Sequence, residues 1–252
     1  SPTVLGPLED AADEFEVTEH DRILSAAPFS HLYGIFNFHM ALSRGAAAVL
    51  LPAFTPQDLG QAVSIHQPTM LFLGPAHAAA MLGQGLINQR DFASVRFSVF
   101  SGASCPTHVL ESYQAAIPAS AVAQLRGMTE IQAGSFTRAS DPLSVAATSA
   151  GPPARGNEAR IRSLDGDILL AGEEGELEIR GPSVFGGYLD NQEANAAAFT
   201  TDGWFRSGDL ACIDDSGYIR LTGRTKDLIN RGGVKYNPTD IEALLMQNDA
   251  ID

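Results

Sequence analysis

The 252-residue sequence predicts an α/β protein in which a mainly parallel βαβ subdomain precedes a small antiparallel, β-barrel-like subdomain. Three observations support this prediction. Short apolar runs alternate with segments of helical period over residues 22–126, a loop rich in Pro and Gly follows near 140–160, and short strands separated by turns come after it. We therefore expect three regions, 1–140, 141–223 and 224–252, of which the last begins a further domain.

In the first region, each predicted strand is a short apolar run. These runs are "RILSAA" (22–27), "AAAVLL" (46–51), "TMLFLG" (69–74), "RFSVFSG" (96–102) and "AVAQLR" (121–126). Helices are predicted between them near 31–44, 57–66, 75–84 and 107–116. Pro56 and Pro75 suit the first turn of a helix, and Pro118 stands where the last helix should have ended. This alternation implies βαβ units and a parallel sheet.

The second region contains short strands with turn signals between them. The strands are "ARIRSL" (159–164), "GELEIRG" (175–181) and "GYIRLTG" (217–223), separated by turns such as "DGD" and "DDSG". After Gly223, the segment "NPTDIEALLMQ" (237–247) predicts a helix that begins near Pro238. The second region is therefore expected to be mostly antiparallel.

Composition limits the classes of function. The net charge of −14 opposes non-specific binding to nucleic acid or to an anionic membrane, so a polyanionic ligand needs local donors or a metal ion. No apolar run approaches the roughly 20 residues of a membrane span, and the acidic start does not resemble a signal peptide. Cys105 and Cys212 lack metal-type spacing. We expect a soluble, cytoplasmic protein with reduced cysteines and no zinc site.

Two short motifs in the first region each allow two interpretations. Gly102 in "SGAS" (101–104) would let a flat ligand approach, or would simply form a tight strand-to-helix turn. "GMTE" (127–130) is expected directly after a strand, where ligands of parallel sheets bind. There Thr129 could bond a phosphate oxygen and Glu130 a hard cation, or the pair could cap a helix.

Three further residues are ambiguous when considered alone. Asp209 in "SGDL" could accept hydrogen bonds from the hydroxyls of a ribose, and Arg224, across a predicted hairpin, could donate to the same sugar or to a phosphate. A surface ion pair is the alternative for both. His31 begins a predicted helix after a strand, a position at which a histidine is more often structural than catalytic.

The order and spacing of the motifs are more specific than any one motif. From "APFSHLYG" through "SGAS", "RGMTE", "GELEIRGPSVFGGYLDN", "DGWFRSGDL" and "GRTKDLINRGGVKYNPTDIE", the chain resembles the AMP-forming acyl-CoA synthetase, adenylation-domain and luciferase superfamily over about residues 20–252. This resemblance implies ATP-dependent activation of a carboxylate to an acyl-adenylate, followed by transfer to a thiol, with ATP/AMP, Mg²⁺ and coenzyme A as cofactors.

The resemblance also implies roles for individual residues. It assigns adenine and acyl contacts to the segments Gly102, Ala103, Ser104 and Arg126, Gly127, Met128, with His31 beside the acyl pocket. It assigns phosphate contact to Thr129, Mg²⁺ to Glu130, and the ribose to Asp209 and Arg224. At Arg126 the family usually has an aromatic residue that stacks on adenine; a guanidinium plane can also stack.

The C-terminal part of the resemblance concerns a hinge. Lys226 matches the position about which the small C-terminal domain of the family swings, and Gly232 and Gly233 match the loop that follows. The family's phosphate loop should precede "APFSHLYG" and does not occur in residues 1–26, and its C-terminal lysine should lie beyond Asp252. We therefore expect a fragment that is nearly inactive alone and that self-associates through the exposed face.

The acid is only partly constrained. Relatives that activate amino acids usually carry an Asp within the motif matching residues 28–31, which here read "PFSH", so the sequence favours an acyl or aryl acid with coenzyme A as acceptor. A domain that loads a carrier protein and a non-catalytic nucleotide-binding or interaction module are the two alternatives.

Overall fold

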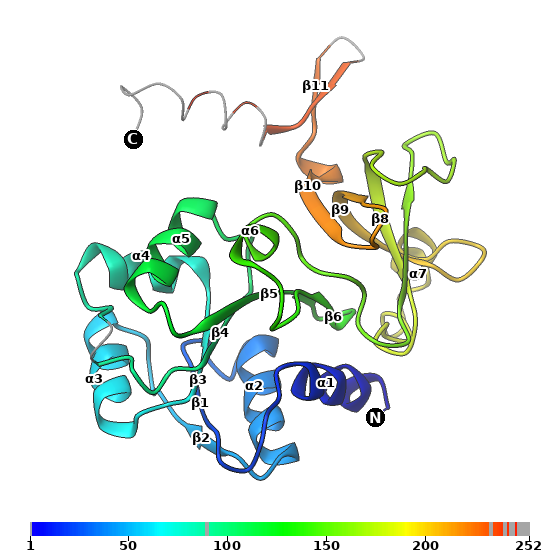
Figure 1. Cartoon of the computed structure of the whole chain (residues 1–252). Coiled ribbons are helices and arrows are strands. Elements are labelled where there is room, and N and C mark those ends of the chain that lie inside the picture. Colours follow the sequence, from blue (N-terminus) through cyan, green and yellow to red (C-terminus); the bar gives the residue numbers. More distant parts are fainter. Residues whose placement is uncertain (1, 89–90, 232–233, 239–240, 242–244, 246–252) are drawn as a thin grey trace. The chain divides into compact units, whose positions relative to one another are not determined.

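The computed structural model describes residues 2–88, 91–231, 234–238, 241 and 245, which fall into two compact units (Figure 1). Unit 1 comprises Ser1–Asn157 with Gly181–Phe185, and unit 2 comprises Glu158–Arg180 with Gly186–Asp252. The functional division into 1–140, 141–223 and 224–252 stays a prediction, because compactness alone does not assign function.

Unit 1 is built on a six-stranded sheet with the order β2-β1-β3-β4-β5-β6. Neighbouring strands from β2 to β5 are parallel, and β6 runs antiparallel to β5. The strands are β1 (Arg22–Ser25), β2 (Ala47–Val49), β3 (Met70–Leu73), β4 (Phe97–Phe100), β5 (Ala121–Met128) and β6 (Gln132–Phe136). The mainly parallel sheet predicted from the sequence is thereby confirmed.

Helices cover both faces of this sheet, as a parallel sheet requires (Figure 1). They are α1 (Pro2–Glu14), α2 (Leu32–Ser43), α3 (Pro56–His66), α4 (Pro75–Gly83), α5 (Thr107–Ala116) and the short α6 (Leu143–Ala146). Leu8 of α1 and Met40 of α2 pack on one face, whereas Val63, Met81 and Tyr113 of α3, α4 and α5 pack on the other. Alternate strand residues point to opposite faces, so the strands β1 to β5 each contribute to both apolar clusters.

The predicted helices agree closely with the structure. Pro56 and Pro75 lie in the first turns of α3 and α4, where the missing N–H of a proline costs no hydrogen bond. The side chain of Thr55 accepts a hydrogen bond from the backbone N–H of Asp58 and caps α3. Helix α5 ends at Ala116, just before Pro118.

Helix α1 and strand β6 of unit 1, like the short α6, were not expected from the sequence. Helix α1 contains Pro7, which weakens its helical signal, yet its buried face packs on the sheet and against β6. Strand β6 has the sequence "QAGSF", which carries little apolar character of its own. Burial against the rest of unit 1 therefore determines that α1 forms a helix and β6 a strand, because local propensity has only a weak influence on secondary structure.

Unit 2 contains a four-stranded antiparallel sheet with the order β10-β9-β8-β7. Its elements are β7 (Glu158–Arg162), β8 (Gly175–Arg180), α7 (Gln192–Ala198), β9 (Phe205–Ile213), β10 (Ile219–Arg224), the 3₁₀ turn η1 (Thr225–Asp227), and the paired β11 (Ile229–Arg231) and β12 (Val234–Tyr236). The antiparallel region was predicted correctly, but β9 was not predicted as a strand.

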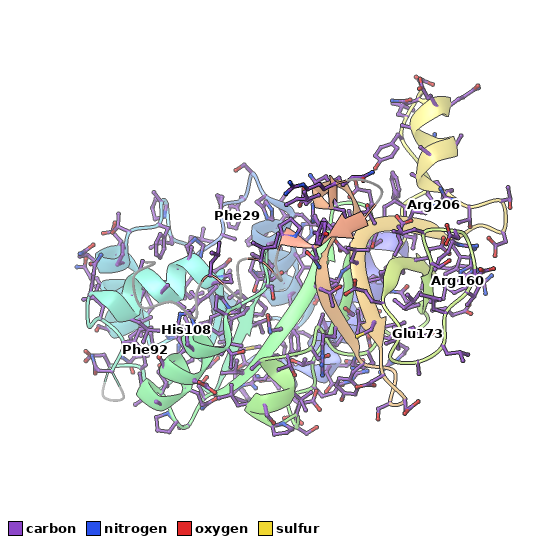
Figure 2. All side chains as sticks on the ribbon, turned by 90° about the horizontal axis from the view of Figure 1, so that it is seen from above. Phe29, Phe92, His108, Arg160, Glu173 and Arg206 are labelled. Carbon is purple, nitrogen blue, oxygen red and sulfur yellow. The ribbon has the colours of Figure 1, made fainter. Side chains whose placement is uncertain are left out.

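A buried carboxylate lies on the sheet of unit 2. Glu178 of β8 is fully buried, and its oxygens lie 2.6 Å from Nε of Arg160 and 2.7 Å from Nε of Arg162. Arg160 also bonds Asp202 and lies over the ring of Trp204, 4.2 Å from its centre. Arg160 and Arg206, from β7 and β9, are labelled in Figure 2.

Several predictions concern the C-terminal segment and the surface. The helix predicted over 237–247 falls mainly on 239–240, 242–244 and 246–252, and Gly232 and Gly233 likewise lie outside the described residues. Unit 1 exposes large apolar side chains, among them Phe29 and Leu42, but self-association stays a prediction. Among the described residues, no helix combines the length and the apolar character needed to cross a membrane.

Candidate functional site

The "SGAS" segment forms an exposed loop between two buried anchors. Ser101 and Cys105 are buried, and the residues between them, 102–104, are exposed. The backbone N–H of Ser101 donates to the carbonyl of Leu73 at 3.0 Å, which ties the loop to the end of β3. Gly102 has φ +89°, in the left-handed region that favours glycine, and a Cβ there would meet no atom within 4 Å. The loop is thus a tight turn that also leaves open space beside its backbone.

Gln124 joins this loop to β5, and sequence reasoning did not single it out. Its Oε1 accepts a hydrogen bond from the backbone N–H of Cys105 at 3.2 Å, and its Nε2 donates to the carbonyl of Ala146. The signal available in the sequence was one polar residue inside the apolar run "AVAQLR". The Cys105 thiol beside it is inert, because burial raises its pKa to about 12.

The "GMTE" residues were expected to follow β5. They belong instead to the hairpin that β5 forms with β6. Gly127 and Met128 are the last residues of β5, and Thr129 and Glu130 form a β-turn that closes where the N–H of Ile131 donates to the carbonyl of Met128 at 3.1 Å. The helix-cap interpretation is therefore wrong. The turn results from close backbone approach, since a Cβ on Gly127 would lie 2.4 Å from the carbonyl oxygen of Gln132.

The turn is held in place from one side by a neighbouring loop. The backbone N–H of Phe185 donates to the carbonyl of Glu130 at 2.8 Å. Thr129 is exposed and Glu130 is half-buried, so the two side chains lie at the end of a hairpin rather than inside the core. Thr129 and Glu130 can therefore be reached by an anionic ligand or by the cation that accompanies it, and their assigned roles stay predictions.

Arg126 and His31 differ in how accessible their side chains are. Arg126 is only 7% exposed and faces Ser135 across the β5–β6 pair, so stacking on an adenine stays a prediction that requires its guanidinium to become accessible. His31 is exposed at the start of α2, where its Nδ1 accepts a hydrogen bond from the N–H of Tyr33 at 3.1 Å. That bond is a helix cap, which agrees with the structural interpretation of this histidine.

In unit 2, Asp209 and Arg224 pair across β9 and β10. They are opposite each other in the strand register, and Nε of Arg224 lies 3.1 Å from Oδ1 of Asp209. The Asp209 side chain is 10% exposed and that of Arg224 is 53% exposed, so the pair is open at its arginine end. The N–H of Asp209 is held by the hydroxyl of Ser207 at 3.2 Å. A largely buried carboxylate fixed in this way can accept hydrogen bonds from a vicinal diol.

The predicted hinge residue lies immediately after this pair. Lys226 is exposed and belongs to the 3₁₀ turn η1. The hydroxyl of Thr225, its neighbour, donates to the carbonyl of Gly208 at 3.2 Å, and Gly208 has φ +72°. Thr225 therefore anchors the chain to β9 directly before Lys226. A hinge at Lys226 needs such an anchored segment on one side, but hinge motion itself stays a prediction.

The comparison with known protein families identifies the chain. The model of the AMP-binding enzyme family matches residues 6–189, and this match spans the 101–105 loop and the Thr129–Glu130 turn. The chain belongs to the AMP-binding enzyme family. The family resemblance found in the sequence motifs is thereby confirmed.

Relatives extend the match to the remainder of the chain. A 3-[(3aS,4S,7aS)-7a-methyl-1,5-dioxo-octahydro-1H-inden-4-yl]propanoyl:CoA ligase from Mycobacterium tuberculosis is 33% identical over 238 residues, which cover 94% of this chain and 45% of that protein. ATP-bound MatB from Rhodopseudomonas palustris has a TM-score of 0.89 at 27% identity, over 96% of this chain and 48% of that one. The chain thus spans about half the length of these proteins.

A second solved structure includes a metal ion. O-succinylbenzoate coenzyme A synthetase (MenE) from Bacillus subtilis, in complex with ATP and a magnesium ion, has a TM-score of 0.86 at 28% identity and covers 97% of this chain and 50% of that one. In the described part of our chain, no group of three His, Cys, Asp or Glu side chains could hold a metal ion. At nucleotide sites Mg²⁺ takes most of its ligands from phosphate oxygens and water and needs only one or two carboxylates, so the assignment of Mg²⁺ to Glu130 stays a prediction.

Proposed function

We propose that the protein containing this chain activates a carboxylic acid with ATP and then transfers the acyl group to coenzyme A. A carboxylate oxygen attacks the α-phosphorus of ATP, pyrophosphate leaves, and the thiol of coenzyme A then displaces AMP from the acyl-adenylate. Membership of the AMP-binding enzyme family and a CoA ligase as relative support this activity. Among the chain's own residues, the observation that carries the proposal is the Asp209–Arg224 pair.

Asp209 is suited to bind the two vicinal hydroxyls of a ribose. Its carboxylate is largely buried, its backbone is fixed by Ser207, and Arg224 lies 3.1 Å from one of its oxygens. The two oxygens of an ionised carboxylate accept hydrogen bonds only, which suits the two O–H donors of a ribose. Arg224, whose side chain is 53% exposed, keeps further N–H groups for the sugar or a phosphate oxygen.

Unit 1 supplies a different kind of contact. The exposed 102–104 backbone has small side chains, so a flat base can approach it closely, and the hydroxyl of Thr129 can donate to a phosphate oxygen. When bound, Mg²⁺ neutralises phosphate charge, and the half-buried Glu130 is the side chain we propose to hold it. Each contribution is proposed from the residues of its own unit.

The acceptor and the acid are the finer parts of the proposal. Coenzyme A is favoured because the relatives named above include CoA ligases. An α-amino acid is disfavoured, because "PFSH" offers no carboxylate to pair with an ammonium group. Product formation with coenzyme A, compared with a phosphopantetheine-bearing carrier protein, separates the two acceptors.

Calorimetric titration with AMP tests the nucleotide part of the proposal. We expect the unsubstituted chain to bind AMP and Asp209→Ala to bind roughly 100-fold more weakly, because two charge-assisted hydrogen bonds are lost. The matched control is Asp202→Ala, which removes another carboxylate of unit 2 that is paired with an arginine. It should leave AMP affinity unchanged.

Two outcomes would contradict the proposal. Equal AMP affinity for Asp209→Ala and the unsubstituted chain would mean that Asp209 forms only a structural ion pair. An unsubstituted chain that is folded but binds neither AMP nor ATP with Mg²⁺ would remove the nucleotide site itself.

A further inference from the structure

The 101–105 loop begins and ends beside the same residue of the neighbouring strand, Gln124. Phe100, the last residue of β4, is paired in register with Gln124 of β5. Cys105, at the far end of the loop, donates its backbone N–H to Oε1 of the same Gln124 at 3.2 Å. Gln124 therefore lies beside the start of the loop and holds the far end of the loop through its side-chain carboxamide.

Gln124 also holds two other segments. Its Nε2 donates to the carbonyl of Ala146, and its backbone N–H and carbonyl are both bonded to Thr137, each at 2.9 Å. Gln124 is 9% exposed, so its carboxamide forms hydrogen bonds with protein groups rather than with water. One buried side chain thus links the 101–105 loop to α6, on the strand whose hairpin carries Thr129 and Glu130.

We propose that Gln124 is a positioning residue for nucleotide binding, and that it acts by holding the exposed backbone of residues 102–104 in its binding conformation. This inference rests on the proposed function, in which that backbone contacts the nucleotide. Gln124 does not itself touch the ligand. Its effect arises because a loop that is ordered before binding loses less conformational entropy when the ligand arrives.

The chain offers a matched control for this side chain. Nε2 of Gln114, at the end of α5, donates to the carbonyls of Ser120 at 2.8 Å and Ile117 at 3.2 Å. Gln114 therefore joins the end of a helix to the segment that precedes β5, at the amino end of the strand and away from the 101–105 loop. Methionine at either position keeps most of the side-chain volume and removes the hydrogen bonds.

The experiment compares AMP binding by Gln124→Met and Gln114→Met in the whole chain, by calorimetry, together with the urea unfolding of each. We expect both substitutions to destabilise the chain to a similar degree, since each removes hydrogen bonds of one buried or half-buried carboxamide. Only Gln124→Met should weaken AMP binding, by about tenfold. This split separates positioning from a general loss of stability.

Equal AMP affinity in the two variants would overturn the inference, whether both match the unsubstituted chain or both bind more weakly. No AMP binding by the unsubstituted chain would instead contradict the proposed function. If Gln124→Met does not fold, hydrogen exchange of the unsubstituted chain decides. The Cys105 amide should exchange slowly without ligand and the 102–104 amides rapidly until AMP is added; rapid exchange at Cys105 would overturn the inference.

Discussion

Unit 1 and unit 2 stabilise their sheets, and form their candidate ligand contacts, with different chemistry. Unit 1 buries apolar side chains on both faces of a parallel sheet and holds its 101–105 loop with the neutral carboxamide of Gln124. Unit 2 buries Glu178 between Arg160 and Arg162 and presents Asp209 with Arg224. Unit 1 also pairs the buried Asp21 with Arg96 at 2.8 Å, but at the positions compared below we expect substitutions to act through shape in unit 1 and through charge in unit 2.

The largest effect is expected for the buried charge of unit 2. Glu178→Gln should lower the free energy of unfolding by about 3–5 kcal/mol, because two partly buried arginines lose their carboxylate. Urea unfolding followed by the fluorescence of Trp204, the chain's single tryptophan, measures this change in unit 2 itself.

Glu158→Gln is the control for that substitution. Glu158 pairs with Arg180 at 2.9 Å, but both side chains are largely exposed, so the cost should stay below about 1 kcal/mol. If Glu178→Gln costs no more than Glu158→Gln, the contrast between a charge-held unit 2 and an apolar unit 1 fails.

A smaller effect is expected from shape in unit 1. Gly127→Ala should cost about 2–3 kcal/mol, because its Cβ would lie 2.4 Å from the carbonyl oxygen of Gln132 and the hairpin must open. Gly102→Ala, at φ +89° but with no atom within 4 Å of its Cβ, should cost only about 1 kcal/mol. Urea unfolding followed by circular dichroism compares the two, and the reverse order would contradict close approach as the reason for Gly127.

The smallest effect concerns a charged side chain of unit 1 that we propose to contact the ligand. Glu130→Gln should weaken the binding of ATP with Mg²⁺ by about tenfold, because a neutral amide attracts the cation less, and should leave AMP binding without metal unchanged. Glu111→Gln, an exposed carboxylate of α5, is the control. Calorimetry with and without Mg²⁺ measures the difference, and an equal loss for both ligands would show that Glu130 only shapes its turn.

The sequence nominated the residues of the candidate site but did not predict their local geometry. Motif order pointed to Gly102, Thr129, Glu130, Asp209 and Arg224, and the structure places Asp209 and Arg224 directly opposite each other. The sequence prediction assigned Thr129 and Glu130 to a segment after a strand, whereas in the structure they form the turn of a hairpin. The error arose because "QAGSF" has no apolar run to mark β6.

Hydrophobic periodicity and the positions of prolines were sufficient to predict the parallel sheet and its helices. Buried strands have short apolar runs in the sequence, and packed helices have apolar residues at helical spacing. Helix α1, strand β6 and strand β9 depended on burial against segments distant in the chain, which local propensity does not encode. The same holds for Gln124. Its residue type was visible in the sequence, but only the tertiary structure brought Cys105 and Ala146 to its carboxamide, because hydrogen-bond partners 19 and 22 residues away are chosen by packing.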